Sequence, residues 1–173
     1  MWDFFATVRH RHSVRKFQPD MPVEAEKLHA ILEMACAAPS AGDIQAYRIF
    51  VVQNGTDRIA LGHAAQEQSF LAEAPACLVF CADPPRSANV FGERGAQLYA
   101  LQDATIAAAY AQLAVVAAGL GSIWIGQFDE VEVRRLLALE PELIPIALLG
   151  LGYPAELPEP STRRRLEDIV SFR

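Results

Sequence analysis

The stretch that most constrains how this chain folds is an uncharged, alanine-rich run over residues 103–121, DATIAAAYAQLAVVAAGLG. No Lys, Arg, Asp or Glu occurs between Asp103 and Asp129. Alanine and unbranched residues favour a helix; Asp103 suits its N-terminus, and Gly119 and Gly121 suit its C-terminal end. Because a helix that is apolar on all sides has to be buried on all sides, the sequence predicts a core helix that a second copy of the chain partly covers.

A membrane-spanning segment is the competing interpretation of this run. The uninterrupted apolar stretch is short for a bilayer, and it contains Tyr110 and Gln112. The first residues, MWDFFATVRHRHS, lack the apolar region of a signal peptide. Three cysteines, Cys36, Cys77 and Cys81, cannot form a complete set of disulfides. We therefore expect a cytoplasmic protein that makes no contact with a membrane.

The composition suits a single domain over residues 1–173, in which 52% of the residues are hydrophobic. That share is high for a soluble monomer and supports burial between two subunits. The net charge of −6 argues against nucleic acid as a partner. Basic residues cluster at the two ends of the chain, but they form no patterned basic face of the kind that nucleic-acid binding requires.

Helical and strand patterns alternate along the chain, which indicates an α/β or α+β layered fold with helices covering a sheet. Residues 83–95, DPPRSANVFGERG, are expected to form an irregular surface loop that is long enough to act as a lid. Pro154, Pro158 and Pro160 mark an extended tail. The expected helices cover residues 1–8 (with Trp2, Phe5 and Val8 on one side), 24–38, 58–72 and 129–137, and the expected strands cover residues 47–52, 77–81, 122–125 and 144–150.

Two basic clusters are candidates for binding a phosphate. Arg11, Ser13 and Arg15 alternate along a segment near the N-terminus, and residues 163–165 are three arginines near the C-terminus. Guanidinium groups and a hydroxyl bind phosphate through charge-assisted hydrogen bonds. If the two ends of the chain meet, both clusters would bind one anion. The alternative for each cluster is a solvated basic surface.

A loop of small residues, PSAGDIQ at 39–45, lies between a helix and a strand, where ligand contacts concentrate. Small residues let a flat ligand approach the backbone, and Ser40, Asp43 and Gln45 offer hydrogen-bonding groups. An ordinary turn is an equal alternative. Residues 119–121, GLG, and Gly126 flank a later strand, which would also bring backbone N–H groups close to a planar ring. The GxGxxG pattern of a Rossmann nucleotide-binding turn is absent.

Metal and hydrolase chemistry have no support in the sequence. Cys77 and Cys81 lie in an apolar run without metal-ligand spacing, so we expect them in the core and expect no metal site. The GxSxG pattern of a nucleophile elbow is also absent.

Five segments, taken in order, resemble the FMN-dependent nitroreductase family: RHSVRKF at 11–17, APSAGDIQAYRIFVV at 38–52, GLG at 119–121, WIGQFD at 124–129 and RRRLEDIV at 163–170. The resemblance covers nearly the whole chain. It implies a three-layer α+β fold, with a mixed, mainly antiparallel sheet flanked by helices, in an intertwined homodimer. It also implies two FMN sites at the subunit interface, each lined by both chains.

The resemblance also implies roles for particular segments. The basic residues at both ends would hold the phosphate and ribityl chain. The 39–45 loop, from the partner chain, would lie beside the isoalloxazine, and residues 125–127 would offer backbone contacts near its N5 and O4. The implied cofactor-binding residues are Arg11, His12, Ser13, Arg15, Pro39, Ser40, Ala41, Asp43, Gln45, Ile125, Gly126, Gln127, Arg163 and Arg164.

The implied reaction is a ping-pong hydride transfer. NAD(P)H would reduce the flavin at N5 and leave, and a nitroaromatic, a quinone or a related acceptor would then take its place. No side chain is implied as catalytic, because the chemistry lies on the flavin. Other chemistry on the same fold (dehalogenation, dehydrogenation or flavin destruction) and a non-catalytic flavin-binding dimer are the alternatives.

Three features depart from the family pattern. Asp43 stands where many relatives have Asn; a carboxylate there accepts from the flavin N3–H, and if ionised it would lower the flavin potential. Tyr110 stands where relatives often have a small amide. The chain is also short, which leaves substrate choice to the segment that carries Phe91, Arg94 and Tyr99.

Overall fold

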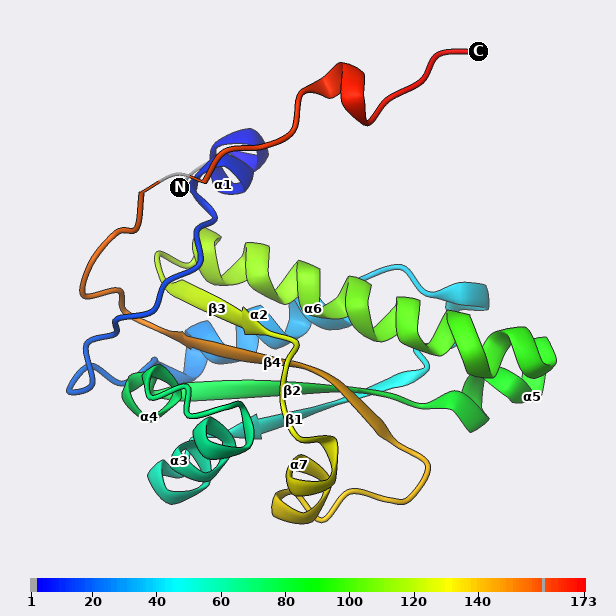
Figure 1. Ribbon diagram of the computed structural model, residues 1–173, viewed down its shortest axis with the longest axis horizontal. Coiled ribbons are helices and arrows are strands. Elements are labelled where there is room, and N and C mark those ends of the chain that lie inside the picture. The colour runs from blue at the N-terminus through cyan, green and yellow to red at the C-terminus, as the bar shows by residue number, and fades with distance from the viewer. Residues whose placement is uncertain (1–2, 160) are drawn as a thin grey trace.

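The computed structural model describes residues 3–159 and 161–173, which build a four-stranded sheet covered by helices on both faces (Figure 1). The strand order is β1-β2-β4-β3, and each neighbouring pair is antiparallel. The three-layer α+β prediction is confirmed. The strands are β1 (Tyr47–Val52), β2 (Ala76–Ala82), β3 (Gly121–Ile125) and β4 (Ile144–Gly152).

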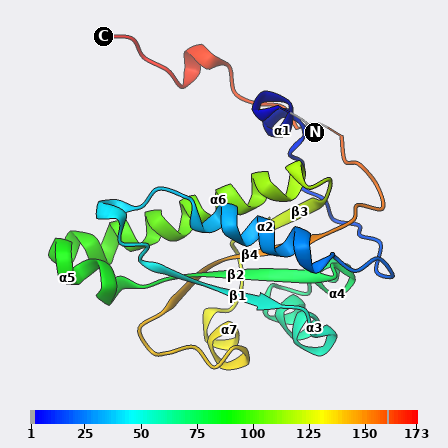
Figure 2. The ribbon, with the colours of Figure 1, turned by 180° about the vertical axis from the view of Figure 1, so that it is seen from behind.

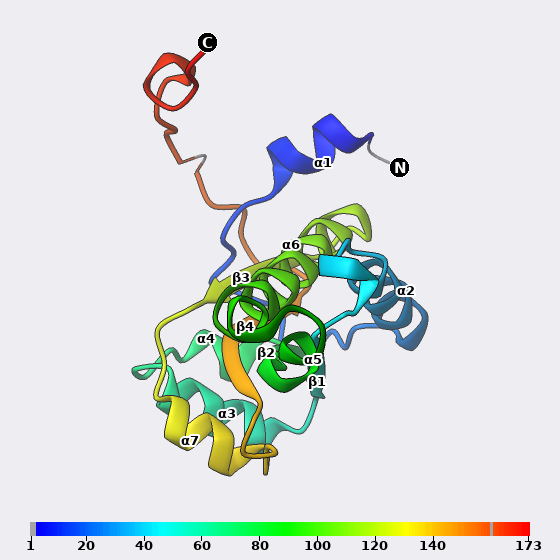
Figure 3. The ribbon, with the colours of Figure 1, turned by 90° about the vertical axis from the view of Figure 1, so that its right-hand side faces the viewer.

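Two groups of helices form the outer layers (Figure 3). One face of the sheet carries α2 (Ala25–Cys36) and α6 (Ala100–Ala117), which lie beside each other (Figure 2). The opposite face carries α3 (Gly55–Ala64), α4 (Phe70–Glu73) and α7 (Glu130–Leu136). Because both faces are covered, the sheet separates two apolar cores.

Strand β2 shows how the sequence builds these two cores. Side chains of a strand alternate between its faces; Leu78 and Phe80 pack toward α2 and α6, whereas Cys77, Val79 and Cys81 pack toward the other layer. All seven residues of β2 are buried. The prediction of a buried central strand with its cysteines in the core is confirmed.

Helix α6 extends further toward the N-terminus than the sequence predicts. It continues without a gap from α5 (Pro84–Arg94) through a π-helical turn (Gly95–Tyr99). Asp103 therefore lies inside a helical run, and the prediction that it begins the helix is wrong. The run is long and apolar enough to cross a membrane by length and composition alone, but a core helix passes the same test, and its sheet-facing side is packed in the core.

The prediction of an irregular loop over residues 83–95 is also wrong, because most of the segment is α5. Asp83 caps this helix by accepting a hydrogen bond from the Arg86 N–H at 3.1 Å. Pro84 and Pro85 occupy its first turn, where the missing N–H groups would have no intrahelical partner. Gly92, with φ of 59°, interrupts the regular helix.

The single helix predicted over residues 58–72 is divided into α3 and α4. Gln66 and Glu67 adopt positive φ values of 58° and 61°, which end the first helix. Asn54 caps α3 by accepting from two backbone N–H groups, so the helix begins at Gly55. The predicted helices over residues 24–38 and 129–137 and the four predicted strands agree with the structure within about two residues, as assignments of element ends generally do.

The two chain ends lie near each other where they leave the sheet. Phe17 bridges Pro154, the Gln18 N–H donates to the Tyr153 carbonyl at 2.9 Å, and Lys16 pairs with Glu156 at 2.8 Å. Beyond this contact the tail, with a short turn over Leu166–Asp168, extends away from the body (Figure 1). The predicted marker Pro160 lies outside the described residues.

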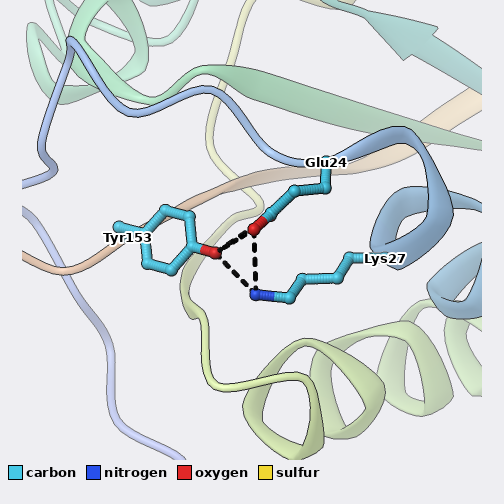
Figure 4. A network of polar contacts seen from close by, with 3 residues as sticks. All are labelled: Glu24, Lys27 and Tyr153. Atoms are coloured by element: carbon cyan, nitrogen blue, oxygen red, sulfur yellow. Dashed lines mark hydrogen bonds and ion pairs between the residues drawn. The ribbon is translucent and has the colours of Figure 1, made fainter.

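A polar cluster at the end of β4 fixes the segment of chain that leaves this strand (Figure 4). The Tyr153 hydroxyl donates to the Glu24 carboxylate at 2.7 Å and accepts from Lys27 Nζ at 2.5 Å. The hydrogen bond from Tyr153 lowers the pKa of Glu24. The cluster joins the start of α2 to the first residue after β4.

At the N-terminus, α1 (Phe4–His10) begins later than the predicted helix because Asp3 accepts from the Ala6 N–H at 2.7 Å and caps it. Phe4, Phe5 and Val8 are exposed in the protomer. The predicted helix also included Trp2, which lies outside the described residues.

Candidate functional site

The basic N-terminal segment lies along the open edge of β3. The Val14 N–H donates to the Ser122 carbonyl at 2.9 Å, and Ser13 bridges Ser122 in parallel. This contact places Arg15 beside the end of β3. A cavity of about 200 Å³ opens there. Its lining residues are Arg15, Gln66, Gln68, Phe70, Ile123, Trp124, Ile125, Gly126 and Gln127.

The structure thus brings together two groups that the sequence predicts separately, the basic segment and residues 125–127. Among the described residues, Arg11 and Arg15 have no hydrogen bond or ion pair, and the backbone N–H groups of Gly126 and Gln127 have no acceptor. The Arg15 guanidinium, unpaired among the described residues, lies beside these free N–H donors, and that is the chemistry that an anionic cofactor with a polar ring edge requires. The residues present therefore fit a flavin mononucleotide.

His12 lies on the other side of this segment. It lines a crevice of about 170 Å³ together with His10, Val14, Val116 and Leu120. Successive side chains of an extended segment point to opposite sides, so the odd-numbered Arg11, Ser13 and Arg15 share one side and His12 faces the other. Within one protomer His12 does not line the cavity that Arg15 lines.

The 39–45 loop is held in an unusual backbone conformation. Gly42, Asp43 and Gln45 have φ values of 58°, 56° and 49°. The Ser40 Oγ accepts from the Gln45 N–H at 3.0 Å, which leaves its own O–H free to donate. Gln45 Nε2 donates to the carbonyl of Asp43 at 2.9 Å and also to the Asp43 carboxylate. The predicted polar residues of the loop therefore bind one another.

The three predicted substrate-side residues contact one another, and one of them, Phe91, lies against this loop. Phe91 and Tyr99 pack edge to face with ring centroids 5.2 Å apart. Arg94 Nε donates to the Tyr99 hydroxyl at 3.0 Å. A Cβ atom on Gly42 would lie 2.9 Å from Phe91 Cζ, so only glycine lets the loop approach the ring this closely. The loop and the end of α5 form one unit.

Within one protomer the 39–45 loop and the Arg15 cavity lie at opposite edges of the sheet. The loop leads into β1 at one edge, whereas Arg15 lies beside β3 at the other edge. The C-terminal arginines join neither group by a hydrogen bond or ion pair among the described residues: Arg163 donates to Ser161, and Arg164 donates to the Asp168 carbonyl at 2.6 Å. The chain ends meet, but before these arginines.

Comparison with known proteins identifies the family. Residues 8–68 and 60–153 match the Nitroreductase family. The chain belongs to the nitroreductase family. An NADH dehydrogenase of Thermus thermophilus is 34% identical, over 94% of this chain and 92% of its own length. An FMN reductase (NADPH) of Bacillus subtilis is 28% identical, over 87% of this chain and 66% of its own length.

A solved structure shows the same fold. B. megaterium NfrA2 has a TM-score of 0.91 and 27% identity to this nitroreductase-family chain, and the match covers 99% of this chain and 74% of NfrA2. The family and fold that the five sequence segments predicted are therefore confirmed.

A larger cavity of this nitroreductase-family protomer lies elsewhere, between α3 and α7, with a volume of about 370 Å³. Its charged side chains are already committed: His63 binds Glu67 at 2.7 Å, and Arg135 binds Glu132 at 2.8 Å. Because these side chains are already paired, whereas Arg15 has no hydrogen bond or ion pair among the described residues, we place the functional site at the smaller cavity beside Arg15. In the described parts of the chain, no cluster of His, Cys, Asp and Glu could hold a metal ion.

Sequence reasoning missed two parts of the site. Gln66, Gln68 and Phe70 reach the cavity only because the predicted long helix is broken there, and the polar residues at the break were its one available signal. The second part is Asp103, which is 2% exposed and binds the backbone of the 39–45 loop. Its signal was a single carboxylate within an alanine-rich helix.

Proposed function

We propose that this protein is a homodimeric, FMN-dependent NAD(P)H oxidoreductase of the cytoplasm that reduces a nitroaromatic, a quinone or a related small acceptor. The observation that carries the proposal is the cavity in which Arg15 lies beside the free backbone N–H groups of Gly126 and Gln127. The relative named FMN reductase (NADPH) supports it.

The N-terminal segment would hold the phosphate end of FMN. Arg11 and Arg15 would bind the phosphate through charge-assisted hydrogen bonds, and Ser13 would bind the ribityl chain. His12 faces the opposite side, so we assign it a backbone contact only. The exposed tail would bring Arg163 and Arg164 to the same phosphate.

The ring of the cofactor would lie over the end of β3. When bound, FMN supplies the hydride-transfer chemistry at its N5. Ile125 ends β3 and lines the cavity, and Gly126 and Gln127 follow the strand. The backbone N–H groups of Gly126 and Gln127 would donate to the polar edge of the ring, where they would stabilise negative charge. Trp124 and Phe70 line the same cavity and would exclude water from one side.

A second copy of the chain would complete the site. A cavity of about 200 Å³ is smaller than the usual range for ligand sites, roughly 300 Å³ and above. The partner's 39–45 loop would supply Pro39, Ser40 and Ala41 beside the ring and Asp43 and Gln45 at its polar edge. The Phe91–Tyr99 unit, which packs on that loop, would form the substrate-side wall together with Arg94.

Exposed apolar surface supports the dimer. Helix α6 leaves Ala109 and Tyr110 exposed, although it has no charged residue after Asp103. Phe4 and Phe5 of α1 are also exposed. The described tail carries further exposed apolar side chains at Leu157, Leu166, Ile169 and Phe172. Surfaces of this kind mark protein–protein contacts.

The test is a visible absorption spectrum of the purified protein, repeated after gel filtration with added FMN. We expect a retained flavin band that bleaches when NADH or NADPH is added without oxygen and returns when a quinone or nitroaromatic follows. Failure to retain flavin even when FMN is offered would refute the enzyme and leave the fold untouched.

A further inference from the structure

A buried carboxylate on α6 binds both ends of the small-residue loop. Asp103 Oδ1 accepts from the Ala41 N–H at 2.9 Å, and Oδ2 accepts from the Ala46 N–H at 3.3 Å. Asp103 is 2% exposed. The two amides flank the residues of the loop that adopt positive φ, so one side chain spans the irregular part of the backbone.

This carboxylate replaces a cap that the loop itself lacks. Ala41 begins a short 3₁₀ turn, Ala41–Asp43, and Ser40, the residue before it, makes no capping hydrogen bond with its side chain. The first N–H groups of a helical turn need an acceptor from outside it. Among the described residues Asp103 has no ion-pair partner. The two backbone N–H groups are its hydrogen-bond donors.

The loop needs such a restraint because its backbone conformation is costly. Non-glycine residues rarely adopt positive φ, and such conformations persist only where the surroundings hold them. Asp43 and Gln45 both do so here. Arg86 Nε adds a hydrogen bond to the Ile44 carbonyl at 2.7 Å, from α5. Asp103 is the restraint that acts from the buried side.

We propose that Asp103 is a positioning residue, which holds residues 41–46 in the shape that presents Ser40, Asp43 and Gln45 to the flavin. The effect on flavin binding rests on the proposed function, whereas the restraint of the loop by Asp103 rests on the hydrogen bonds alone. Because Asp103 lies on α6, the helix with the exposed apolar side, the loop that one subunit offers to its partner is fixed to the proposed dimer interface.

The first experiment measures site-resolved amide exchange in the flavin-free protein. In the parent we expect the Ala41 and Ala46 amides to exchange more slowly than that of Gly42, whose N–H has no acceptor among the described residues. If all three amides exchange alike in the parent, the proposal is overturned without any variant.

The second experiment compares Asp103→Asn with Ala108→Gly. Asparagine keeps one acceptor oxygen and turns an NH₂ group toward the other N–H, so we expect at least one of the two amides to exchange about tenfold faster or more. Ala108 is buried on the same helix but takes part in neither of the two hydrogen bonds that Asp103 accepts. Its change to glycine lowers the stability of the helix as a whole. Equal exchange in the two variants would overturn the proposal.

The third measurement uses the flavin-loaded protein. We expect Asp103→Asn to bind FMN about tenfold more weakly and Ala108→Gly to bind it like the parent. The midpoint potential of the bound flavin should rise only in Asp103→Asn, because a loosened loop takes the Asp43 carboxylate away from the ring. Unchanged affinity and potential, together with faster exchange, would overturn the positioning role. A parent that binds no FMN would refute the proposed function, whereas the exchange data would still judge the restraint.

Discussion

The sharpest test of the site is the replacement of Arg15 by alanine. Arg15 is exposed and has no hydrogen bond or ion pair among the described residues, so we expect the free energy of unfolding to change by less than about 0.5 kcal/mol. A hydrogen bond to a charged group contributes about 1.5–3 kcal/mol. Losing one to the FMN phosphate therefore weakens binding by roughly 10- to 150-fold.

The assay is a fluorescence titration of FMN into flavin-free protein, with thermal unfolding and gel filtration as checks on fold and assembly. Lys16→Ala is the matched control, because it removes the same charge from the next residue. Lys16 is committed to Glu156 at 2.8 Å, and a surface ion pair of this kind contributes little. An FMN affinity for Arg15→Ala within twofold of the parent would refute the assignment. An equal loss in Lys16→Ala would attribute the effect to general charge.

Three further predictions concern assembly, thiols and pH. Ala109→Glu places a charge on the exposed side of α6, so gel filtration should show a folded monomer; a dimer of parental affinity would contradict the proposed interface. One thiol, that of the exposed Cys36, should react with a thiol reagent in the native protein and three after unfolding, because burial raises the pKa of both cysteines in β2 to about 12. Tyr153→Phe removes the hydrogen bond that lowers the pKa of Glu24. The stability from this bond is present above the unfolded pKa of the carboxyl and disappears as pH falls through its lower folded pKa. Urea unfolding should therefore distinguish the variant from the parent at neutral pH, and the difference in unfolding free energy should shrink as the pH falls below the unfolded pKa of the carboxyl.

The parts of the fold that follow from local pattern could be predicted from the sequence. Strand β2 is a continuous apolar run, which indicates burial on both faces. For α5 the capping signal was present in Asp83 followed by two prolines, but the polar composition of residues 83–95 favoured a loop. A stronger weight on the cap than on composition would have given the helix.

Other features depend on contacts between distant residues. The role of Asp103 requires the loop at 41–46 to lie against α6, a separation of about 60 residues along the chain that no periodicity reports. The break between α3 and α4 requires the positive φ values of Gln66 and Glu67, residues without the usual signal of glycine or asparagine. The sequence predicted the basic segment, residues 125–127 and the 39–45 loop as parts of the candidate site. It could not show that one protomer holds the loop at the opposite sheet edge from the other two.

The distance between Arg15 and the 39–45 loop within one protomer would couple cofactor binding to dimer assembly. If FMN binds between Arg15 of one subunit and the 39–45 loop of the other, the cofactor binds the dimer more tightly than the monomer. Thermodynamic linkage then requires FMN to strengthen the dimer by the same factor. The Ala109→Glu variant is predicted to act through assembly alone. The FMN binding that it loses should therefore be recovered at a protein concentration high enough to restore the dimer. The loss in Arg15→Ala should persist there, because the guanidinium is missing from every dimer.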